Sequence, residues 1–173
     1  HVRSRRQRQM CIRDSPELWR NALAGVSGVS AIDAEWLELY PTSSPIAASV
    51  PTPAPAVLSR VEAKRLDPSG QLSLISAREA WADAGFSGAD AELSDEVDPE
   101  RLAVVFGTGI GGAWTLLDAW DTMRERGVRR VMPMTVPMLM PNGNSATIGM
   151  ALKARAAAIT SVSACASGTE SFY

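Results

Sequence analysis

Cys165 stands near the end of the chain between small residues, in the stretch SVSACASG. An apolar run over residues 156–162 precedes it, which predicts a buried strand that turns into a helix at the cysteine. Backbone N–H groups at a helix start favour the thiolate over the thiol and can hold the oxyanion that forms when a thioester is attacked. The pattern indicates an exposed nucleophile, although a lone cysteine is more often a small buried hydrophobe.

This nucleophile has no base within the sequence. The only histidine is His1, in an arginine-rich segment over residues 1–14 whose composition differs from the rest of the chain. A Cys-His pair of the protease kind therefore cannot be assembled from these residues. Two alternatives stay open: the cysteine is inert, or its partners belong to a part of the protein outside these 173 residues.

A glycine-rich segment, GTGIGG at 107–112, follows a predicted strand over 102–106 and precedes a predicted helix over 113–126. Strand, glycines and helix in this order match the dinucleotide fingerprint G-x-G-x-x-G. The acidic residue that should follow about 20 positions later is missing, because the sequence there is GVRRV. A nucleotide-binding module is one alternative, but we favour a tight turn whose glycines let two backbones come close together.

Charge and composition narrow the class of protein. Residues 1–14 carry five arginines and one aspartate, whereas the rest of the chain has 12 basic and 18 acidic residues, a formal charge of −6. An acidic body argues against a nucleic-acid surface. Two cysteines 154 positions apart give no metal-ligand or disulfide spacing, and no apolar run is long enough to span a bilayer. We expect a cytoplasmic protein without a metal and without membrane insertion.

The first 14 residues could be a basic nucleic-acid tail or a localisation signal, but they resemble translated adapter sequence more closely. We exclude them from the fold, which leaves one domain over 15–173. Within it, capping residues and periodicity predict an α/β fold. Beyond the elements named above, the expected elements are helices over 16–24, 71–84 and 144–152, a brief strand over 46–50 in a proline-rich connection, and an irregular stretch over 131–141.

Three blocks in order point to a family: GTGIGG, then GVRRVMPMTVPMLMPN, then SVSACASG. Together with LWRNALAGVSGV and RVEAKRLDPSGQ, they resemble the N-terminal part of a type II 3-oxoacyl-[acyl-carrier-protein] synthase, close to the actinobacterial versions. This is a condensing enzyme of the thiolase-like superfamily, and the resemblance covers about residues 15–173. It implies a layered α-β-α fold with a mixed sheet, represented here by an incomplete N-terminal half.

The resemblance implies that Cys165 accepts an acyl chain from a carrier protein, with its own N–H in the oxyanion hole. The carbanion from decarboxylated malonyl-carrier protein then attacks the thioester and gives a 3-oxoacyl product. The family's two histidines and lysine lie beyond Tyr173, and its first strand should precede Ser15. We therefore expect a chain that is truncated at both ends and inactive alone. No cofactor is implied besides the phosphopantetheine that carries the substrates.

Further positions carry over one at a time. Ile110 and Thr135 match residues of the acyl pocket, and Thr135 is smaller than the aromatic residue common at that position, which comes from the dimer partner. Four basic residues match positions that meet the acidic carrier protein, with ordinary solvated charges as the alternative: Lys64, Arg65, Arg129 and Arg130. The strand over 156–162 resembles the element that pairs with its copy, so a homodimer is implied.

Fatty-acid elongation is the leading hypothesis. The ketosynthase of a type II polyketide system shares the cysteine motif and stays an alternative, whereas the non-catalytic partner of such systems usually lacks the cysteine. A nucleotide-binding module built on GTGIGG is the alternative from another class. An inert α/β fragment is the simplest one.

Overall fold

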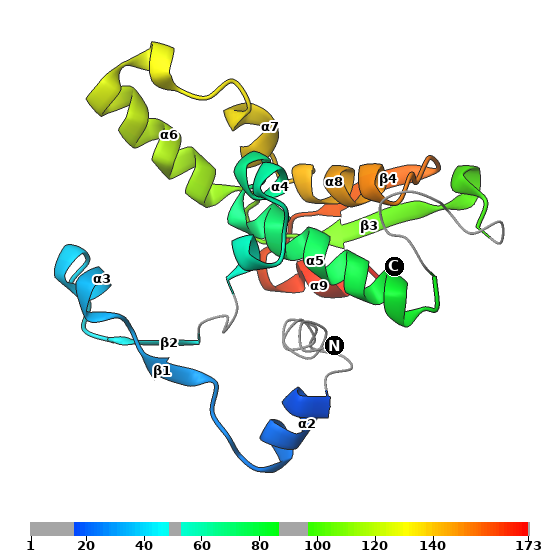
Figure 1. Cartoon of the computed structure of the whole chain (residues 1–173), viewed down its shortest axis with the longest axis horizontal. Coiled ribbons are helices and arrows are strands. Elements are labelled where there is room, and N and C mark those ends of the chain that lie inside the picture. The colour runs from blue at the N-terminus through cyan, green and yellow to red at the C-terminus, as the bar shows by residue number, and fades with distance from the viewer. Residues whose placement is uncertain (1–15, 49–52, 87–96, 173) are drawn as a thin grey trace. The chain divides into compact units, whose positions relative to one another are not determined.

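The computed structural model describes residues 16–48, 53–86 and 97–172, and the chain divides into two units, His1–Pro53 and Ala54–Tyr173 (Figure 1). The described elements of the first unit are α2 (Pro16–Leu23), β1 (Val29–Ala31), α3 (Ala34–Leu39) and β2 (Ile46–Ala48). β1 and β2 pair antiparallel, with Val29 opposite Ala48.

The predicted helix and brief strand of this unit are confirmed as α2 and β2, although residues 49 and 50 of that strand lie outside the described residues. β1 and α3 were not expected. They are three and six residues long, and every residue of β1 is exposed, so neither carries a readable pattern of apolar residues.

The second unit contains the remaining described elements. In chain order they are η1 (Ala54–Ala56), α4 (Arg60–Arg65), α5 (Pro68–Asp83), η2 (Pro99–Arg101), β3 (Ala103–Gly107), α6 (Ala113–Arg126), η3 (Val128–Arg130), α7 (Thr135–Leu139), α8 (Gly143–Ala151), β4 (Ala157–Ser161), η4 (Ala164–Ala166) and α9 (Ser167–Glu170). None of the helices in the described ranges is long and apolar enough to cross a membrane.

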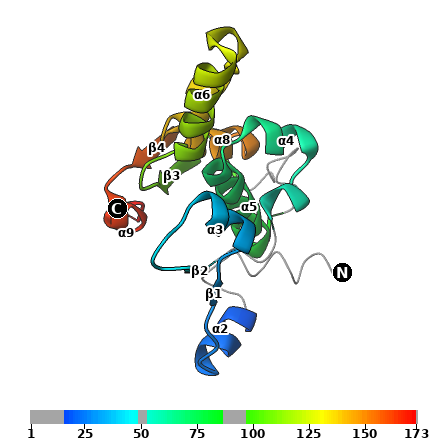
Figure 2. The same ribbon diagram turned by 90° about the vertical axis from the view of Figure 1, so that its left-hand side faces the viewer.

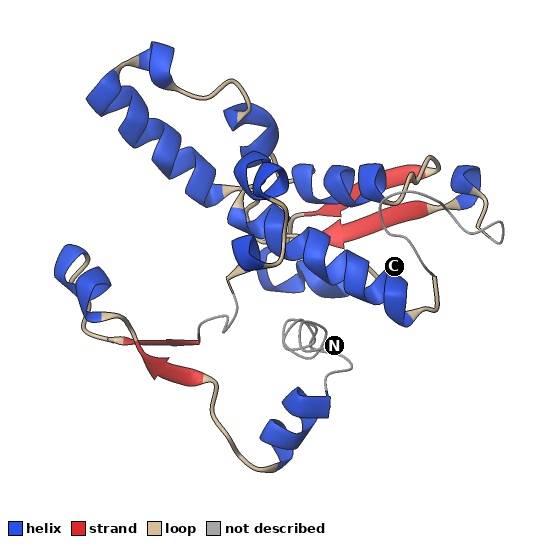
Figure 3. Cartoon of the chain, in the orientation of Figure 1, coloured by secondary structure: helices blue, strands red, loops and turns tan. Residues whose placement is uncertain are grey.

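The centre of this unit is the parallel pair β3–β4, with Val104 opposite Ala158 (Figure 3). Helix α8 covers one face of the pair, and α5 packs against α8. A Cβ added to Gly149 of α8 would only touch the side chains of Ala158 and Val104, at 3.9 and 4.0 Å. The hydroxyls of Ser145 and Thr160 lie 2.6 Å apart and join α8 to β4. This face forms the helix-on-sheet core that the α/β prediction required.

The opposite face of the pair is covered only at one end. Side chains alternate between the faces of a strand, so Val105 and Ile159 point away from α8, and they are 40% and 54% exposed. Helix α9, four residues long, packs at the end of β3 on this side. The layered α-β-α arrangement is thus present with a short second helical layer. The expectation that both strands are buried is wrong: no residue of β4 is buried, and in β3 only Val104, on the α8 face, is buried. The face with Val105 and Ile159 is exposed because so little of the described chain covers it.

Helix boundaries follow local chemistry. Helix α6 begins and ends where the sequence predicted, whereas α5 begins three residues earlier, because Asp67 caps it and Pro68 fits the first turn. The stretch over 131–141 is not irregular throughout, since it contains α7. Pro137 is tolerated there because it lies in the first turn, where N–H groups have no helical partner.

Candidate active site and cavity rim

Cys165 lies on a sharp turn between β4 and α9, with its thiol exposed. The turn begins with the short 3-10 helix η4 rather than directly with an α-helix. Ala164, the residue before the cysteine, has φ +50°. A left-handed conformation costs a residue with a Cβ about 1 to 2 kcal/mol, so the surrounding contacts must hold this backbone in place.

Hydroxyl groups provide these contacts. Ser167 is only 3% exposed, and its Oγ accepts a hydrogen bond from the N–H of Ser163 at 2.9 Å. The same Oγ has two carbonyl acceptors for its proton, Ala164 at 2.8 Å and Thr108 at 3.0 Å. The hydroxyl of Ser163 donates to Oε2 of Glu170. Side-chain hydrogen bonds within residues 163–170 therefore connect the residues before and after Cys165.

Thr108 links this turn to the glycine-rich segment. Its N–H donates to the carbonyl of Ser161 at 3.0 Å, and its Oγ1 accepts from the N–H of Gly111 at 3.1 Å. With the bond from Ser167 to its carbonyl, Thr108 contacts the end of β4, the start of α9 and its own glycine turn. Ile110, 74% exposed, stands on that turn. The segments of Ile110 and Cys165 are therefore joined through one residue, while the role of Ile110 in an acyl pocket stays a prediction.

Two of the glycines are needed for close backbone contacts. A Cβ at Gly107 would lie 2.2 Å from the carbonyl oxygen of Ser167, and one at Gly112 would lie 2.3 Å from that of Met138. Real Cβ atoms do not approach so closely, so only glycine fits these two positions. Gly111 has φ +89°, and its added Cβ would lie 2.9 Å from the backbone of Pro141, whereas nothing lies within 4 Å of a Cβ at Gly109. Backbone packing therefore accounts for three of the four glycines of GTGIGG.

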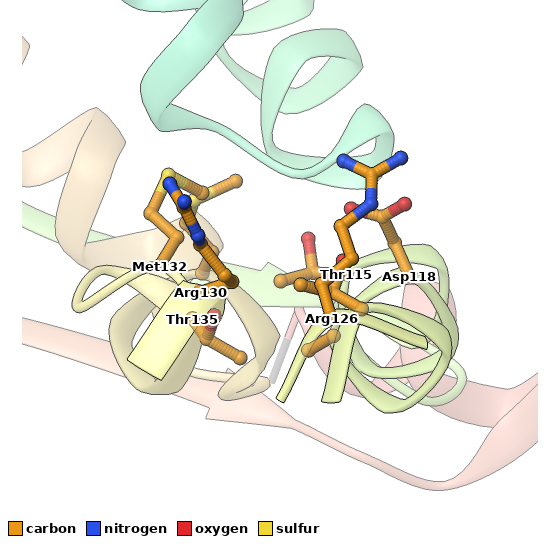
Figure 4. Close-up of a pocket in the computed structure, with 9 residues that line it drawn as sticks. Thr115, Asp118, Arg126, Arg130, Met132 and Thr135 are labelled. Atoms are coloured by element: carbon orange, nitrogen blue, oxygen red, sulfur yellow. The ribbon is translucent and has the colours of Figure 1, made fainter. Parts of the chain in front are cut away.

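A cavity of about 610 Å³ lies between α6 and the segment of η3 and α7 (Figure 4). Arg130 and Thr135, which the sequence assigned to two different roles, both line it. Arg126 also lines it and was missed. The other lining residues are Thr115, Asp118, Ala119, Thr122, Met132 and Met138. The signal that could have identified Arg126 is helical spacing, because it continues the stripe of 115, 118, 119 and 122 along α6.

A second cavity of about 520 Å³ is lined by residues of α4, α5, α7 and α8. Arg65 lines it together with Val61, and Met138 lines both cavities. Arg65 and Arg130 therefore line two neighbouring cavities that share Met138. We call the residues that line these two cavities the cavity rim. Lys64 and Arg129 line neither cavity, although each is next in sequence to a residue that does.

Asp67 joins α5 to α6 at the cavity rim. It is 3% exposed, and its Oδ2 accepts hydrogen bonds from the N–H and the hydroxyl of Thr115, at 2.9 and 2.8 Å. Its Oδ1 accepts from the N–H of Ser69 at 2.9 Å. One carboxylate therefore caps α5 and fastens the first turn of α6. An aspartate before a proline is a recognisable helix cap in the sequence, but the hydrogen bond from Thr115, 48 residues away, could not be predicted from it.

Glu62 fixes α4 on α5. Its Oε1 accepts a hydrogen bond from Arg78 at 2.6 Å, and its Oε2 accepts one from the N–H of Ser59 at 2.8 Å. Burial raises the pKa of Glu62, but the hydrogen bonds from Arg78 and Ser59 and the positive charge of Arg78 outweigh this effect and lower the pKa to about 2. The basic end of α4, with Lys64 and Arg65, is thus held by a charged pair.

Comparison with known proteins agrees with this geometry. The family model described as "Beta-ketoacyl synthase, N-terminal domain" matches residues 11–172. The chain is 36% identical over 157 residues to 3-oxoacyl-[acyl-carrier-protein] synthase 2 of Mycobacterium tuberculosis, covering 91% of this chain and 36% of that protein. It is 33% identical over 159 residues to the protein of the same name from Staphylococcus aureus, with the same coverage.

Solved structures share the fold. A beta-ketoacyl synthase from Burkholderia phymatum matches with a TM-score of 0.69 at 22% identity, covering 89% of this chain and 36% of that one. The ishigamide ketosynthase/chain length factor matches with a TM-score of 0.65 at 22% identity, covering 83% and 34%. The chain thus spans just over a third of the length of the relatives it matches. By its three sequence blocks, its fold and these matches, the chain belongs to the beta-ketoacyl synthase family, whose N-terminal domain it represents.

Proposed function

We propose that the chain is part of a condensing enzyme that elongates acyl chains in fatty-acid biosynthesis, by decarboxylative Claisen condensation of malonyl-carrier protein with an acyl-cysteine thioester. The observation that carries this proposal is the exposed Cys165, held on a strained turn whose backbone is fixed by the buried hydroxyl of Ser167. An exposed nucleophile on a rigid turn suits transfer of an acyl group from a long, flexible carrier arm.

In the proposed reaction the sulfur of Cys165 attacks the carbonyl of the incoming acyl thioester. The bond to the phosphopantetheine sulfur breaks, and that sulfur leaves with the proton of the cysteine. Malonyl-carrier protein then loses carbon dioxide, and the electron pair left behind attacks the acyl-cysteine carbonyl and expels the thiolate of Cys165. The N–H of Cys165 stabilises the negative oxygen at both steps. The proposal includes no metal and no cofactor besides phosphopantetheine.

The partner that we propose for the cavity rim is an acidic acyl carrier protein. Arg65 and Arg130 line neighbouring cavities, and Lys64 and Arg129 flank them in sequence. Such a cluster on a body of negative net charge steers an acidic partner to one place. Ile110 and Thr135 are proposed to contact the acyl chain. The names of the relatives support acyl carrier protein as the partner, because both are 3-oxoacyl-[acyl-carrier-protein] synthases.

Homodimerisation and a cytoplasmic location belong to the same proposal. Among the described residues β4 pairs only with β3, so its second edge is free. Ile159 on β4 and Val162 just after it are 54% and 51% exposed. A free edge with apolar side chains suits pairing with a second copy.

The decisive experiment uses the full-length protein of the source gene, extended to the length of the relatives. Cys165→Ala should lower 3-oxoacyl product formation about a thousandfold or more, because no other group can carry the acyl chain. Mass spectrometry should show one acyl adduct on the wild-type protein and none on the variant, while binding of carrier protein persists. Turnover that survives the substitution would overturn the proposal, as would a source gene with no histidine-bearing second half.

A further inference from the structure

The hydroxyl of Ser167 has more partners than helix capping requires. It is 3% exposed, accepts the N–H of Ser163, and offers its single proton to the carbonyls of Ala164 and Thr108. Two of these partners directly precede Cys165, and the third lies on the glycine turn 59 residues away in sequence. A buried hydroxyl with this arrangement fixes three backbone segments relative to one another.

Two of these contacts act on the strained residue. Ala164, with φ +50°, is held through its own carbonyl, and the N–H of the residue before it is held as well. Strained backbone of this kind persists only where the surroundings hold it. Because Cys165 follows directly, the conformation at Ala164 sets the direction in which the thiol leaves the turn.

The third contact, to Thr108, ties the turn to the segment that carries Ile110. The close approach of Gly107 to the backbone of Ser167 brings the two segments together. The hydrogen bond to the carbonyl of Thr108 adds the directional constraint.

We propose that Ser167 is a positioning residue for the acyl-transfer step: its hydroxyl holds Ala164 in the left-handed conformation and thereby keeps the sulfur of Cys165 in one orientation relative to the glycine turn. This inference rests on the proposed function, since the step that it serves is acylation of Cys165. Ser167 itself exchanges no proton with the substrate and forms no bond to it.

The chain offers a matched control for this test. Ser171 lies on the same segment, and its hydroxyl also donates to a backbone carbonyl, that of Ser167, at 2.9 Å. It has no hydrogen bond to the glycine turn in the described structure. Ser171→Ala therefore removes one hydroxyl of the same type close to the same site without touching Ala164 or Thr108.

The experiment measures three rates in the full-length protein: alkylation of Cys165 by iodoacetamide, acylation by acyl-carrier protein, and condensation. Ser167→Ala should slow alkylation and acylation by about 10-fold to 100-fold, as misplacement of a reacting group does, with the KM for carrier protein unchanged. Ser171→Ala should stay within about twofold of wild type. Equal rates for Ser167→Ala and wild type, or equal losses for both serine variants, would overturn the proposal.

A second substitution tests the link to backbone strain. Ala164→Gly lets residue 164 adopt positive φ without help, so the loss caused by Ser167→Ala should be much smaller in that background. If Ser167→Ala alone does not fold, the comparison of Ala164→Gly with the double variant decides, and a loss of about tenfold or more there would contradict the proposal. Alkylation needs no substrate, so a wild-type protein that alkylates but makes no product would instead overturn the proposed function.

Discussion

The cysteine turn and the cavity rim belong to the same unit but differ in how closely their residues pack. At the turn, the hydroxyl of Ser167 is buried, and a backbone carbonyl lies so near Gly107 that no Cβ fits. At the rim, α6 extends away from β3 and β4 (Figure 2) with a cavity of about 610 Å³ beside it, and a second cavity of about 520 Å³ is lined by α4, α5, α7 and α8. The first region fixes the position of one sulfur atom, whereas the second leaves room and charge for another molecule.

Helix α6 shows the difference in its two faces. The polar stripe that includes Thr115, Thr122 and Arg126 borders the cavity, while the apolar side chains of Trp114 and Trp120 are 61% and 54% exposed. A monomeric protein rarely exposes a row of large apolar side chains such as these. The turn around Cys165 is held by contacts within this chain, whereas recognition of another molecule at the cavity rim stays a proposal.

The largest effect is expected where the turn is tightest. Gly107→Ala places a Cβ 2.2 Å from the carbonyl oxygen of Ser167, so β3 and α9 must move apart. We expect a loss of about 3 kcal/mol in the free energy of unfolding, measured by urea denaturation of the full-length protein. Gly109→Ala is the control, since nothing lies within 4 Å of its added Cβ. A similar loss in both variants would show that the turn is no tighter than its surroundings.

The next largest effect concerns Asp67, a buried residue of the cavity rim. Asp67→Asn replaces an acceptor for the two donors of Thr115 by a group that can present N–H to them, and should cost about 2 kcal/mol in the free energy of unfolding. Asp98→Asn is a matched control. Asp98 also precedes a proline and caps a helix through one N–H at 2.9 Å, but it is exposed. If the two variants lose equal stability, α6 is not anchored through Thr115.

The sequence predicted the cysteine turn well and the rim poorly, for a physical reason. Local signals are sufficient to place a strand, a turn and small residues around Cys165, and Gly127 marks the end of α6. The left-handed conformation of Ala164 has no sequence signal, because the residue is not a glycine. The bond from Ser167 to Thr108 could not be predicted, because it joins residues 59 positions apart. The same holds at the rim, where the bond from Asp67 to Thr115 joins residues 48 positions apart.

The assignment of four basic residues to carrier-protein docking stays a prediction, and the structure distinguishes among them. Lys64, Arg65, Arg129 and Arg130 were treated as two equivalent pairs, but only one member of each pair lines a cavity. Sequence adjacency could not separate them, because neighbouring residues on a short helix point in different directions.

A smaller effect is expected from pH at the edge of the rim. The pKa of Glu62 is about 2 in the folded chain and about 4.5 in its ordinary state, so ionised Glu62 stabilises the fold above pH 4.5, and this contribution is lost as the pH falls toward 2. After allowance for solvent screening we expect a loss of about 1 to 2 kcal/mol. Urea denaturation from pH 7 to pH 3 should show this loss in the wild type and not in Glu62→Gln. In the control Glu100→Gln, whose exposed pair with Arg155 is 3.4 Å long, the wild-type loss should persist.

The smallest effect tests recognition itself. Arg124 and Arg126 lie two residues apart on α6, both are exposed, and only Arg126 lines the cavity with Arg130. Neither Arg126 nor Arg130 forms an ion pair with another described residue, so both charges are available to a partner. Arg126→Glu should raise the KM for carrier protein several-fold, with a strong dependence on salt and little change in kcat, because long-range charge acts on encounter rather than on chemistry. Arg124→Glu changes the net charge equally and should have a weaker effect. Equal effects would mean that only the overall charge of α6 matters, and the cavity would then have no part in docking.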